Sequence, residues 1–396
     1  MMLLDFARSV AGTVTKAASK IPALEERFSL ENRLVGPWPQ GPFLWLHGAS
    51  LGECKMLLSL AIQLQKDLDS CPSLLLTTQK VEVLEYLKTQ NQNISYSIAP
   101  ADTPQTMLAF LKKVKPIGLV LAENELWPGY LSSVRKIALK PSIAIISGRY
   151  QRSFSKADFS AIGFVSMQSG SDLSKIAEDL PPEVASNAIV GGNWKLLSWA
   201  LSDTEIQEPQ DPSVDTTFLS MHFSEWNSLY QMILSSIKRQ EAVVLVPRRL
   251  TEIESFRNEL IDQEILVLEW PLVQKGAVSL VTQYGRSAEV LQKSKTAVVG
   301  GSFNRLLGVH DFWEPLQYGV PTCIGPYARG QKNTVKSLVH AGVLAQIRST
   351  ADYSKRDIAS IELIQSFLSH ERTKIKNSYQ SFLSFLKNLI PGRIHE

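Results

Sequence analysis

"LWLHGASLGE", residues 44–53, begins with a bulky apolar run and ends in small residues followed by one carboxylate. Gly48 and Ala49 keep the side chains small where the backbone must turn, and Glu53 falls in the first turn of the next helical pattern. Helix N-termini carry unpaired N–H groups and partial positive charge, which favour an ionised carboxylate. We therefore predict a strand, a tight loop and a helix that offers Glu53 as a base or charge partner. The alternative is a first-turn glutamate that only offsets the helix dipole.

The same alternation of short apolar runs with longer periodic stretches fills the chain, in two series. Strands that alternate with helices predict a parallel sheet covered on both faces. The first series contains "FLWLH" (43–47), "SLLLTT" (73–78), "IGLVLA" (117–122) and "SIAIIS" (142–147). The second contains "FLSMH" (218–222), "AVVLVP" (242–247), "ILVLEW" (265–270), "TAVVGGS" (296–302) and "PTCIGP" (321–326).

An acidic, proline-containing stretch without periodicity, residues 202–215, separates the two series and is typical of a linker. We predict an α/β fold of two doubly wound, Rossmann-like lobes with a central cleft, where strand-to-helix loops bind ligands. The predicted parts are an amphipathic helix (1–28), a first lobe (29–201), the linker (202–215), a second lobe (216–375) and a C-terminal helix (376–396).

Composition excludes several classes of protein. The 396 residues carry 41 Lys and Arg against 38 Asp and Glu, a formal net charge of +3, which is too weak to predict a nucleic-acid partner. Three cysteines without CxxC spacing argue against a zinc site or a disulfide framework. No run reaches the ~18 to 20 apolar residues of a spanning helix, and no signal peptide is recognisable. A cytosolic location is therefore expected.

The N-terminal stretch "MMLLDFARSVAGTVTKAASKI" (1–21) repeats apolar residues at helical spacing and places Arg8, Lys16 and Lys20 elsewhere. This pattern suits a basic amphipathic helix lying on a membrane surface. A helix packed on its own domain is the alternative.

The second predicted site follows the strand that ends in "TAVVGGSF". Its loop carries Arg305 and His310, and Asp311 is placed to cap a short helix that bears Glu314. A glutamate on such a helix can accept two hydrogen bonds from vicinal hydroxyls, while the glycines and Ser302 offer N–H donors to a phosphate. This combination predicts a nucleotide-sugar site.

With these residues in view, the E-P-x-x-x-G-V-P spacing resembles the donor signature of glycosyltransferases with the two-lobed GT-B architecture. The whole set of motifs, in order, resembles the 3-deoxy-D-manno-octulosonic acid (Kdo) transferases of bacterial lipopolysaccharide synthesis. The motifs are "HGASLGE" (47–53), "ENELWP" (123–128), "GRYQRS" (148–153), "GGNWK" (191–195), "VPRR" (246–249) and "GGSF…HDFWEP" (300–315).

The resemblance implies inverting, metal-independent transfer of Kdo from CMP-Kdo to a lipid A precursor, without a cofactor. The enzyme would lie peripherally at the cytoplasmic face of the inner membrane, without a transmembrane helix. Glu53 matches the catalytic base and Glu123 a second carboxylate of the site. The implied donor-binding residues are Arg248, Gly301, Ser302, His310 and Glu314. Candidates for the acceptor site or the junction of the lobes are His47, Ser50, Glu125, Lys195 and His222, with Glu225 beside the last of them.

Three departures from the family pattern keep alternatives open. "HDFWEP" replaces the usual H-N-P-L-E-P, Arg286 stands where a glutamate is usual, and Tyr327 replaces a histidine. The alternatives are a divergent relative that binds nucleotide or lipid without transferring sugar, and a GT-B transferase that uses another activated sugar. Neither the number of Kdo residues added nor the oligomeric state follows from the sequence.

Overall fold

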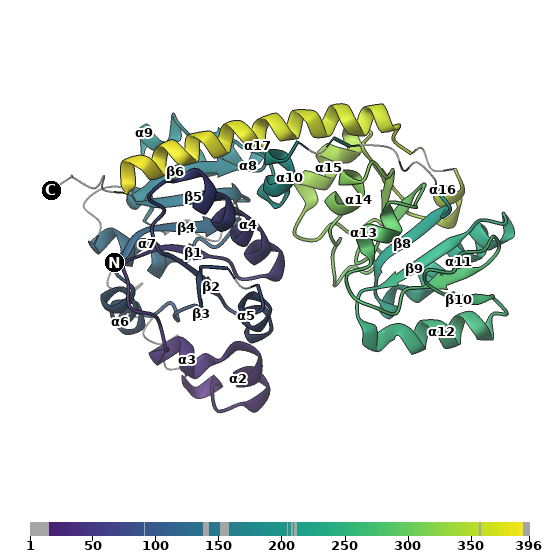
Figure 1. The fold of residues 1–396 in the computed structure, drawn as a ribbon, viewed down its shortest axis with the longest axis horizontal. Helices are drawn as coiled ribbons and strands as arrows, with labels where there is room; N and C mark the ends of the chain where they lie inside the picture. Colours follow the sequence, from purple (N-terminus) through teal and green to yellow (C-terminus); the bar gives the residue numbers. More distant parts are fainter. Residues whose placement is uncertain are drawn as a thin grey trace. The chain divides into compact units, whose positions relative to one another are not determined.

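The protein is described by a computed structural model over residues 16–90, 92–137, 142–150, 158–203, 205–206, 209, 212–355 and 358–390, without the side chains of residues 27 and 350. Two compact units divide the chain (Figure 1). Unit 1 comprises Met1–Asp203 and Glu371–Glu396, and unit 2 comprises Thr204–His370. The predicted membrane-surface helix falls mostly on residues 1–15, outside the described residues.

Unit 1 is built on a seven-stranded sheet in which every pairing is parallel. The strand order reverses between the two central strands, β1 and β4, as in doubly wound folds. In spatial order the strands are β3 (Ser95–Ile98), β2 (Leu74–Thr78), β1 (Phe43–His47), β4 (Pro116–Ala122), β5 (Ile143–Gly148), β6 (Ile162–Met167) and β7 (Ile189–Val190).

Helices follow most of these strands and bury their apolar faces on the sheet. The helices are α2 (Pro22–Phe28), α3 (Leu30–Val35), α4 (Leu51–Asp67), α5 (Val81–Lys88), α6 (Pro104–Val114), α7 (Pro128–Ile137), α8 (Gly170–Ala177), α9 (Pro182–Ala185) and α10 (Leu197–Leu201), with short 3-10 turns η2 (Phe159–Ala161) and η3 (Trp194–Leu196). The core on one face centres on Trp45, whose ring lies 4.6 Å from Phe110 and 5.0 Å from Tyr130. All five residues of β1 are buried, as expected for a strand covered on both faces.

Unit 2 repeats this plan with a second parallel seven-stranded sheet. The order again reverses at its centre, between β8 and β12. In spatial order the strands are β10 (Val267–Glu269), β11 (Val278–Leu280), β9 (Val243–Pro247), β8 (Thr216–Met221), β12 (Ala297–Val299), β13 (Thr322–Ile324) and β14 (Leu344–Gln346). The helices are α11 (Trp226–Lys238), α12 (Ile253–Asp262), α13 (Ser287–Leu291), α14 (Trp313–Gln317), α15 (Lys332–His340) and α16 (Thr350–Ser354), with turns η4 (Phe223–Glu225) and η5 (Leu250–Glu252).

The C-terminal helix α17 (Ile361–Leu389) is longer than predicted and begins 15 residues before position 376. Its later turns pack on unit 1, where the Phe382 ring lies 5.6 Å from Trp194 and the Tyr379 hydroxyl donates to Asp67 at 2.8 Å. The aromatic face predicted for this segment is therefore part of the unit 1 core. Periodicity alone did not reveal the earlier turns, because residues 361–375 alternate charged and apolar side chains less regularly.

Candidate active site

The loop between β1 and α4 places Glu53 at the start of a helix, as predicted. Ser50 is the N-cap of α4, and its hydroxyl accepts a hydrogen bond from the Glu53 N–H at 3.3 Å. The Glu53 carboxylate returns the interaction to the loop, which completes a capping box. A side chain at Gly48 would lie 2.9 Å from the Glu53 Cβ, so glycine lets the strand end pack directly against the helix. Ser50 thus has a structural task in this unit.

Within the part of the chain that the structure describes, the protein engages one oxygen of the Glu53 carboxylate. Oε2 accepts from the N–H of Ala49 at 2.7 Å and of Ser50 at 3.1 Å. Within the described residues, Oε1 accepts no hydrogen bond, although it is not among the buried polar atoms that lack partners. The residue is 8% exposed. Glu53 is therefore held rigidly by one oxygen while the other stays accessible to a ligand.

The surroundings of Glu53 raise its pKa above the ordinary value for a glutamate. Burial is the main cause, and the negative charges of Glu123 and Glu125 add to it. The Ser50 hydrogen bond and the Lys195 charge act in the opposite direction. A carboxylate with a raised pKa is a stronger base when ionised, which suits proton abstraction near neutral pH.

Glu123, directly after β4, forms a buried charge cluster with two cations. Lys195 Nζ lies 2.7 Å from its Oε1, and the Arg149 guanidinium binds its Oε2. Burial opposes ionisation of Glu123, but Lys195 and Arg149 outweigh it and lower the pKa. Glu123 has a φ of +50°, an uncommon backbone conformation for a residue other than glycine. Glu53 and Glu123 therefore have opposite protonation tendencies, which is typical of paired acid–base sites.

Lys195 lies within unit 1, where its Cε would be 3.3 Å from a Cβ built on Gly52. This glycine at the start of α4 leaves room for the ammonium group to reach Glu123. Arg149 was not among the predicted site residues, although it stands in the quoted "GRYQRS" motif. The contact between Arg149 and Glu123 could not be predicted from the sequence, because β4 and β5 bring the two residues together only when the sheet forms.

His47 and Glu125 form a second, more buried network. His47 is fully buried, with Nδ1 2.9 Å from the Thr77 hydroxyl and Nε2 3.4 Å from Glu125 Oε2. The same carboxylate oxygen accepts from Trp127 Nε1 at 2.7 Å. Although burial opposes ionisation, these partners lower the pKa of Glu125. The His47 ring has no accessible surface and lies beside Glu125; its role at the acceptor site or the junction of the lobes stays a prediction.

In unit 2, Glu225 uses both carboxylate oxygens to join two loops. Oε2 accepts from the N–H of His222 at 3.0 Å and of Gly301 at 2.8 Å, and Oε1 accepts from the N–H of Phe303 at 3.0 Å. The residue is only 2% exposed. Glu225 therefore holds the loop after β12 against the loop after β8.

This arrangement corrects part of the predicted phosphate site. The Gly301 N–H donates to Glu225 and is not available to a phosphate. Ser302 is fully buried, and its hydroxyl donates to the Val299 carbonyl at 2.5 Å and accepts from the Gly325 N–H at 2.8 Å. These bonds engage the hydroxyl, so the predicted role of the Ser302 N–H as a phosphate donor stays a prediction. The sequence could not reveal that a carboxylate from the loop after β8 already satisfies the Gly301 N–H.

Three basic side chains lie at the same end of the unit 2 sheet. His222 and His310 face each other with their Nε2 atoms 2.9 Å apart, so one ring donates and the other accepts. Burial, the Arg248 charge and His222 lower the pKa of His310 to about 4. Burial also lowers the pKa of His222, aided by Arg249 and Arg248, against the opposing charges of Glu252 and Glu225. The exposed Arg248 is thus the permanent positive charge beside two neutral imidazoles.

Glu314 lies in the first turn of α14 and is partly exposed. Asp311 was predicted to cap this helix, but the N-cap is Phe312. Asp311 lies one residue earlier, and its Oδ1 accepts from the Trp313 N–H at 3.0 Å. Arg286, where the family usually has a glutamate, pairs with Glu289 one turn later at 3.0 Å. No cluster of three or more His, Cys, Asp or Glu side chains in the described ranges could hold a metal. Among the described helices, none is both long and apolar enough to cross a bilayer.

Comparison with known proteins finds one matching family model and several relatives of the same description. Residues 22–178 match the family described as 3-deoxy-D-manno-octulosonic-acid transferase (kdotransferase). The 3-deoxy-D-manno-octulosonic acid transferase of Chlamydophila psittaci is 24% identical over 378 residues, covering 87% of this chain and 86% of its own length. The 3-deoxy-D-manno-octulosonic acid transferase of Aquifex aeolicus is 23% identical over 358 residues, which cover 87% of this chain and 94% of its own length.

The chain is similar to the Kdo transferase family over most of its length. The similarity is distant, since both relatives share only about a quarter of their residues with this chain. Among solved structures, UDP-GlcNAc 2-epimerase from Neisseria meningitidis covers 88% of this chain with a TM-score of 0.52 at 11% identity. A glycosyltransferase from Rickettsia africae covers 90% with a TM-score of 0.51 at 8% identity. These two likenesses establish the GT-B fold of this chain.

Proposed function

We propose that this relative of the Kdo transferases transfers Kdo from CMP-Kdo to a lipid A precursor with inversion and without a metal. The observation that carries the proposal is the Glu53 carboxylate, held by two amides through Oε2 while Oε1 remains accessible. An inverting transfer needs one base for the attacking hydroxyl. Similarity to the Kdo transferases supports the choice of the sugar and the acceptor class.

In the proposed step, the acceptor hydroxyl oxygen attacks the anomeric carbon of Kdo. The bond from this carbon to the phosphate oxygen breaks, and CMP leaves with the bonding electron pair. The hydroxyl proton passes to Glu53 Oε1. Because the phosphate is already a good leaving group, positive charge and hydrogen-bond donors suffice on that side, and no general acid is required.

The Glu123 cluster would keep Glu53 effective as a base. Glu123 repels a second negative charge and raises the pKa of Glu53, while Lys195 limits that rise. Lys195 and Arg149 keep Glu123 ionised through the pH range in which Glu53 titrates. Glu123 would thus tune the base without itself taking a proton.

The nucleotide would be held in unit 2. Arg248 is exposed beside His310 and would meet the phosphate, and Glu314 would accept hydrogen bonds from the ribose hydroxyls. We expect Glu314→Ala to weaken CMP binding by about 1 to 3 kcal/mol, measured by calorimetry. An unchanged affinity in a folded variant would return Glu314 to a purely structural role.

The decisive experiment is transfer in vitro with CMP-Kdo and a lipid A precursor, followed by analysis of the anomeric configuration of the product. Inverted product, formed equally in the presence of a chelator, is the expected result. Transfer from another activated sugar in place of CMP-Kdo would support the alternative of a GT-B transferase with a different donor. CMP binding without any transfer would identify a non-catalytic relative.

Peripheral contact with the cytoplasmic face of the membrane is a further part of this proposal. It is supported by the spacing of apolar and basic residues in 1–21. Deleting these residues should release the protein from anionic vesicles and leave CMP affinity unchanged. A truncated protein that instead loses thermal stability would mean that the segment packs on unit 1.

A further inference from the structure

Unit 2 contains a cavity of about 860 Å³ that shares Arg305 with the predicted nucleotide-sugar loop but none of the residues proposed to hold CMP. It is formed by the loops that follow β12, β13 and β14 together with α15. These three strands are neighbours in the sheet, and their carboxyl ends form the edge where parallel sheets bind ligands. The location alone therefore makes the cavity a candidate site.

The charge of the lining is of one sign. Among the described residues that line this cavity none is acidic, although the chain as a whole is nearly balanced between 41 basic and 38 acidic residues. The cationic or titratable side chains in the lining are Arg305, Arg329, Lys332, Lys336, His340 and Arg348. Such a gathering of like charges is repulsive in the empty state and becomes favourable when an anion is bound.

None of these six side chains is in an ion pair within the part of the chain that the structure describes. The Arg329 guanidinium donates to the Leu306 carbonyl at 2.9 Å, which ties it to the loop after β12 and leaves its charge uncompensated. The nine-residue helix α15 adds to the positive field, since it has no side-chain cap and no acidic residue in its first turn.

We propose that this cavity binds a phosphate-bearing group of at least two negative charges, separately from the proposed nucleotide site. Phosphate oxygens can accept hydrogen bonds from several cations converging from different loops. The floor is apolar, with Ala328 and Val335, so recognition would come from the charged rim. Leu306 and Leu307 are exposed next to this rim, so the phosphate could belong to a soluble molecule or to a lipid headgroup.

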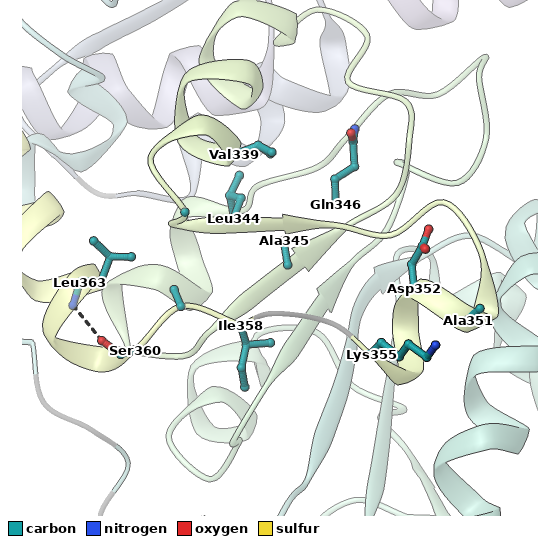
Figure 2. A pocket seen from close by; sticks show the side chains of 12 residues that line it. Val339, Leu344, Ala345, Gln346, Ala351, Asp352, Lys355, Ile358, Ser360 and Leu363 are labelled. Carbon is teal, nitrogen blue, oxygen red and sulfur yellow. Dashed lines mark hydrogen bonds between the residues drawn. The ribbon is translucent and has the colours of Figure 1, made fainter.

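The chain provides a matched control in a neighbouring cavity of about 820 Å³, shown in Figure 2. This cavity shares Val339 and Gln346 with the first but contains Asp352 beside Lys355. Lys355 is exposed, as are Lys332 and Lys336, so substitution at each should leave folding intact. Lys355→Gln therefore removes one nearby positive charge without altering the proposed site.

The soluble arm of the test is titration of the full chain with inorganic pyrophosphate in a calorimeter, without divalent ions. We expect binding that weakens about tenfold or more in Lys332→Gln/Lys336→Gln and stays unchanged in Lys355→Gln. Saturating CMP should leave pyrophosphate affinity unchanged. Displacement by CMP would overturn the proposal, because the pyrophosphate would then occupy the nucleotide site. An equal loss in Lys355→Gln would reduce the effect to general surface charge and also overturn it.

The lipid arm compares vesicles of phosphatidylcholine with and without phosphatidic acid. A lipid headgroup is the source of the phosphate if the protein binds phosphatidic acid but not pyrophosphate, and if the double variant binds phosphatidic acid more weakly. Absence of both pyrophosphate binding and a variant-dependent lipid effect would refute the site. Neither arm uses Kdo or measures transfer, so either result is independent of the proposed function.

Discussion

The loops after β1 and β8 each lead into a helical turn with a capping-box glutamate, but the two carboxylates have different hydrogen-bond partners. In each unit a glutamate at the third position of the helical turn completes a capping box with the N-cap residue, which is Ser50 after β1 and His222 directly after β8. In unit 1 the carboxylate of Glu53 takes two amides through one oxygen, both from its own loop. In unit 2 the carboxylate of Glu225 takes three amides through both oxygens, two of them from the loop after β12.

The difference shows what separates a reactive carboxylate from a structural one. Both are buried and both begin a helical turn, so neither burial nor position distinguishes them. What distinguishes the two carboxylates is the number of N–H groups that a loop distant in sequence donates to them. Glu225 has no oxygen left for a substrate, whereas Glu53 retains one and has a raised pKa.

The largest expected effect is on catalysis. Glu53→Gln should lower the transfer rate ~10²- to 10⁴-fold, because the amide cannot take the proton. The glutamine carbonyl can still accept from the Ala49 and Ser50 N–H groups, so the melting temperature should be unchanged. A variant that keeps most of its rate would make Glu53 only a helix cap.

The matching change in unit 2 should act on stability instead. In Glu225→Gln one carboxylate oxygen is replaced by an NH₂ group, which cannot accept a hydrogen bond. In one orientation this group faces the Phe303 N–H, and in the other it faces the N–H groups of His222 and Gly301. We expect the unfolding free energy to fall by about 2 to 3 kcal/mol, as for lost hydrogen bonds to a charged acceptor. Urea unfolding followed by fluorescence measures this. A variant as stable as the wild type would contradict the role of Glu225 as the tie between the two loops.

The histidine pair predicts a pH dependence of the stability of unit 2. Because the pKa of His310 is lowered from 6.5 to about 4, the folded state resists a proton that the unfolded chain accepts. Its stabilising contribution is therefore full above pH 6.5 and is lost as pH falls from there towards 4. We expect a loss of roughly 1 to 3 kcal/mol over this range, which His310→Gln should largely abolish. Urea unfolding curves at neutral and acidic pH measure this loss of unfolding free energy. If the unfolding free energy of His310→Gln falls with pH as much as that of the wild type, His310 is not the cause.

The smallest expected effect concerns the tuning of Glu53. Glu123→Gln removes a negative charge and frees Lys195, and both changes lower the pKa of Glu53. The acidic limb of the pH–rate profile should then move to lower pH by roughly half a unit to one unit. The sharper control is Glu125→Gln, which removes a weaker contributor and should move the limb less. A larger shift in that variant would reverse the order of influence inferred from the structure.

Much of the architecture was predictable because it depends on local sequence. Alternating buried strands and amphipathic helices indicated two parallel sheets, and the structure confirms both. The position of Glu53 in the first turn of α4 also followed locally, since Ser50 and Glu53 form a capping box three residues apart. The length of α17 did not follow, because its early turns lack a clear apolar face.

The sequence by itself determined the two Rossmann-like sheets, the ordered motifs of the Kdo transferase family and the carboxylate at the start of α4. The tertiary structure alone decided which groups that carboxylate and its counterparts meet. Glu225 meets Gly301 across 76 residues, and His222 meets His310 across 88. The physical reason is that parallel strands bring the loops at their carboxyl ends together only after the sheet has formed. Hydrogen bonds and charges across those loops then fix which side chains are satisfied and which remain available for chemistry.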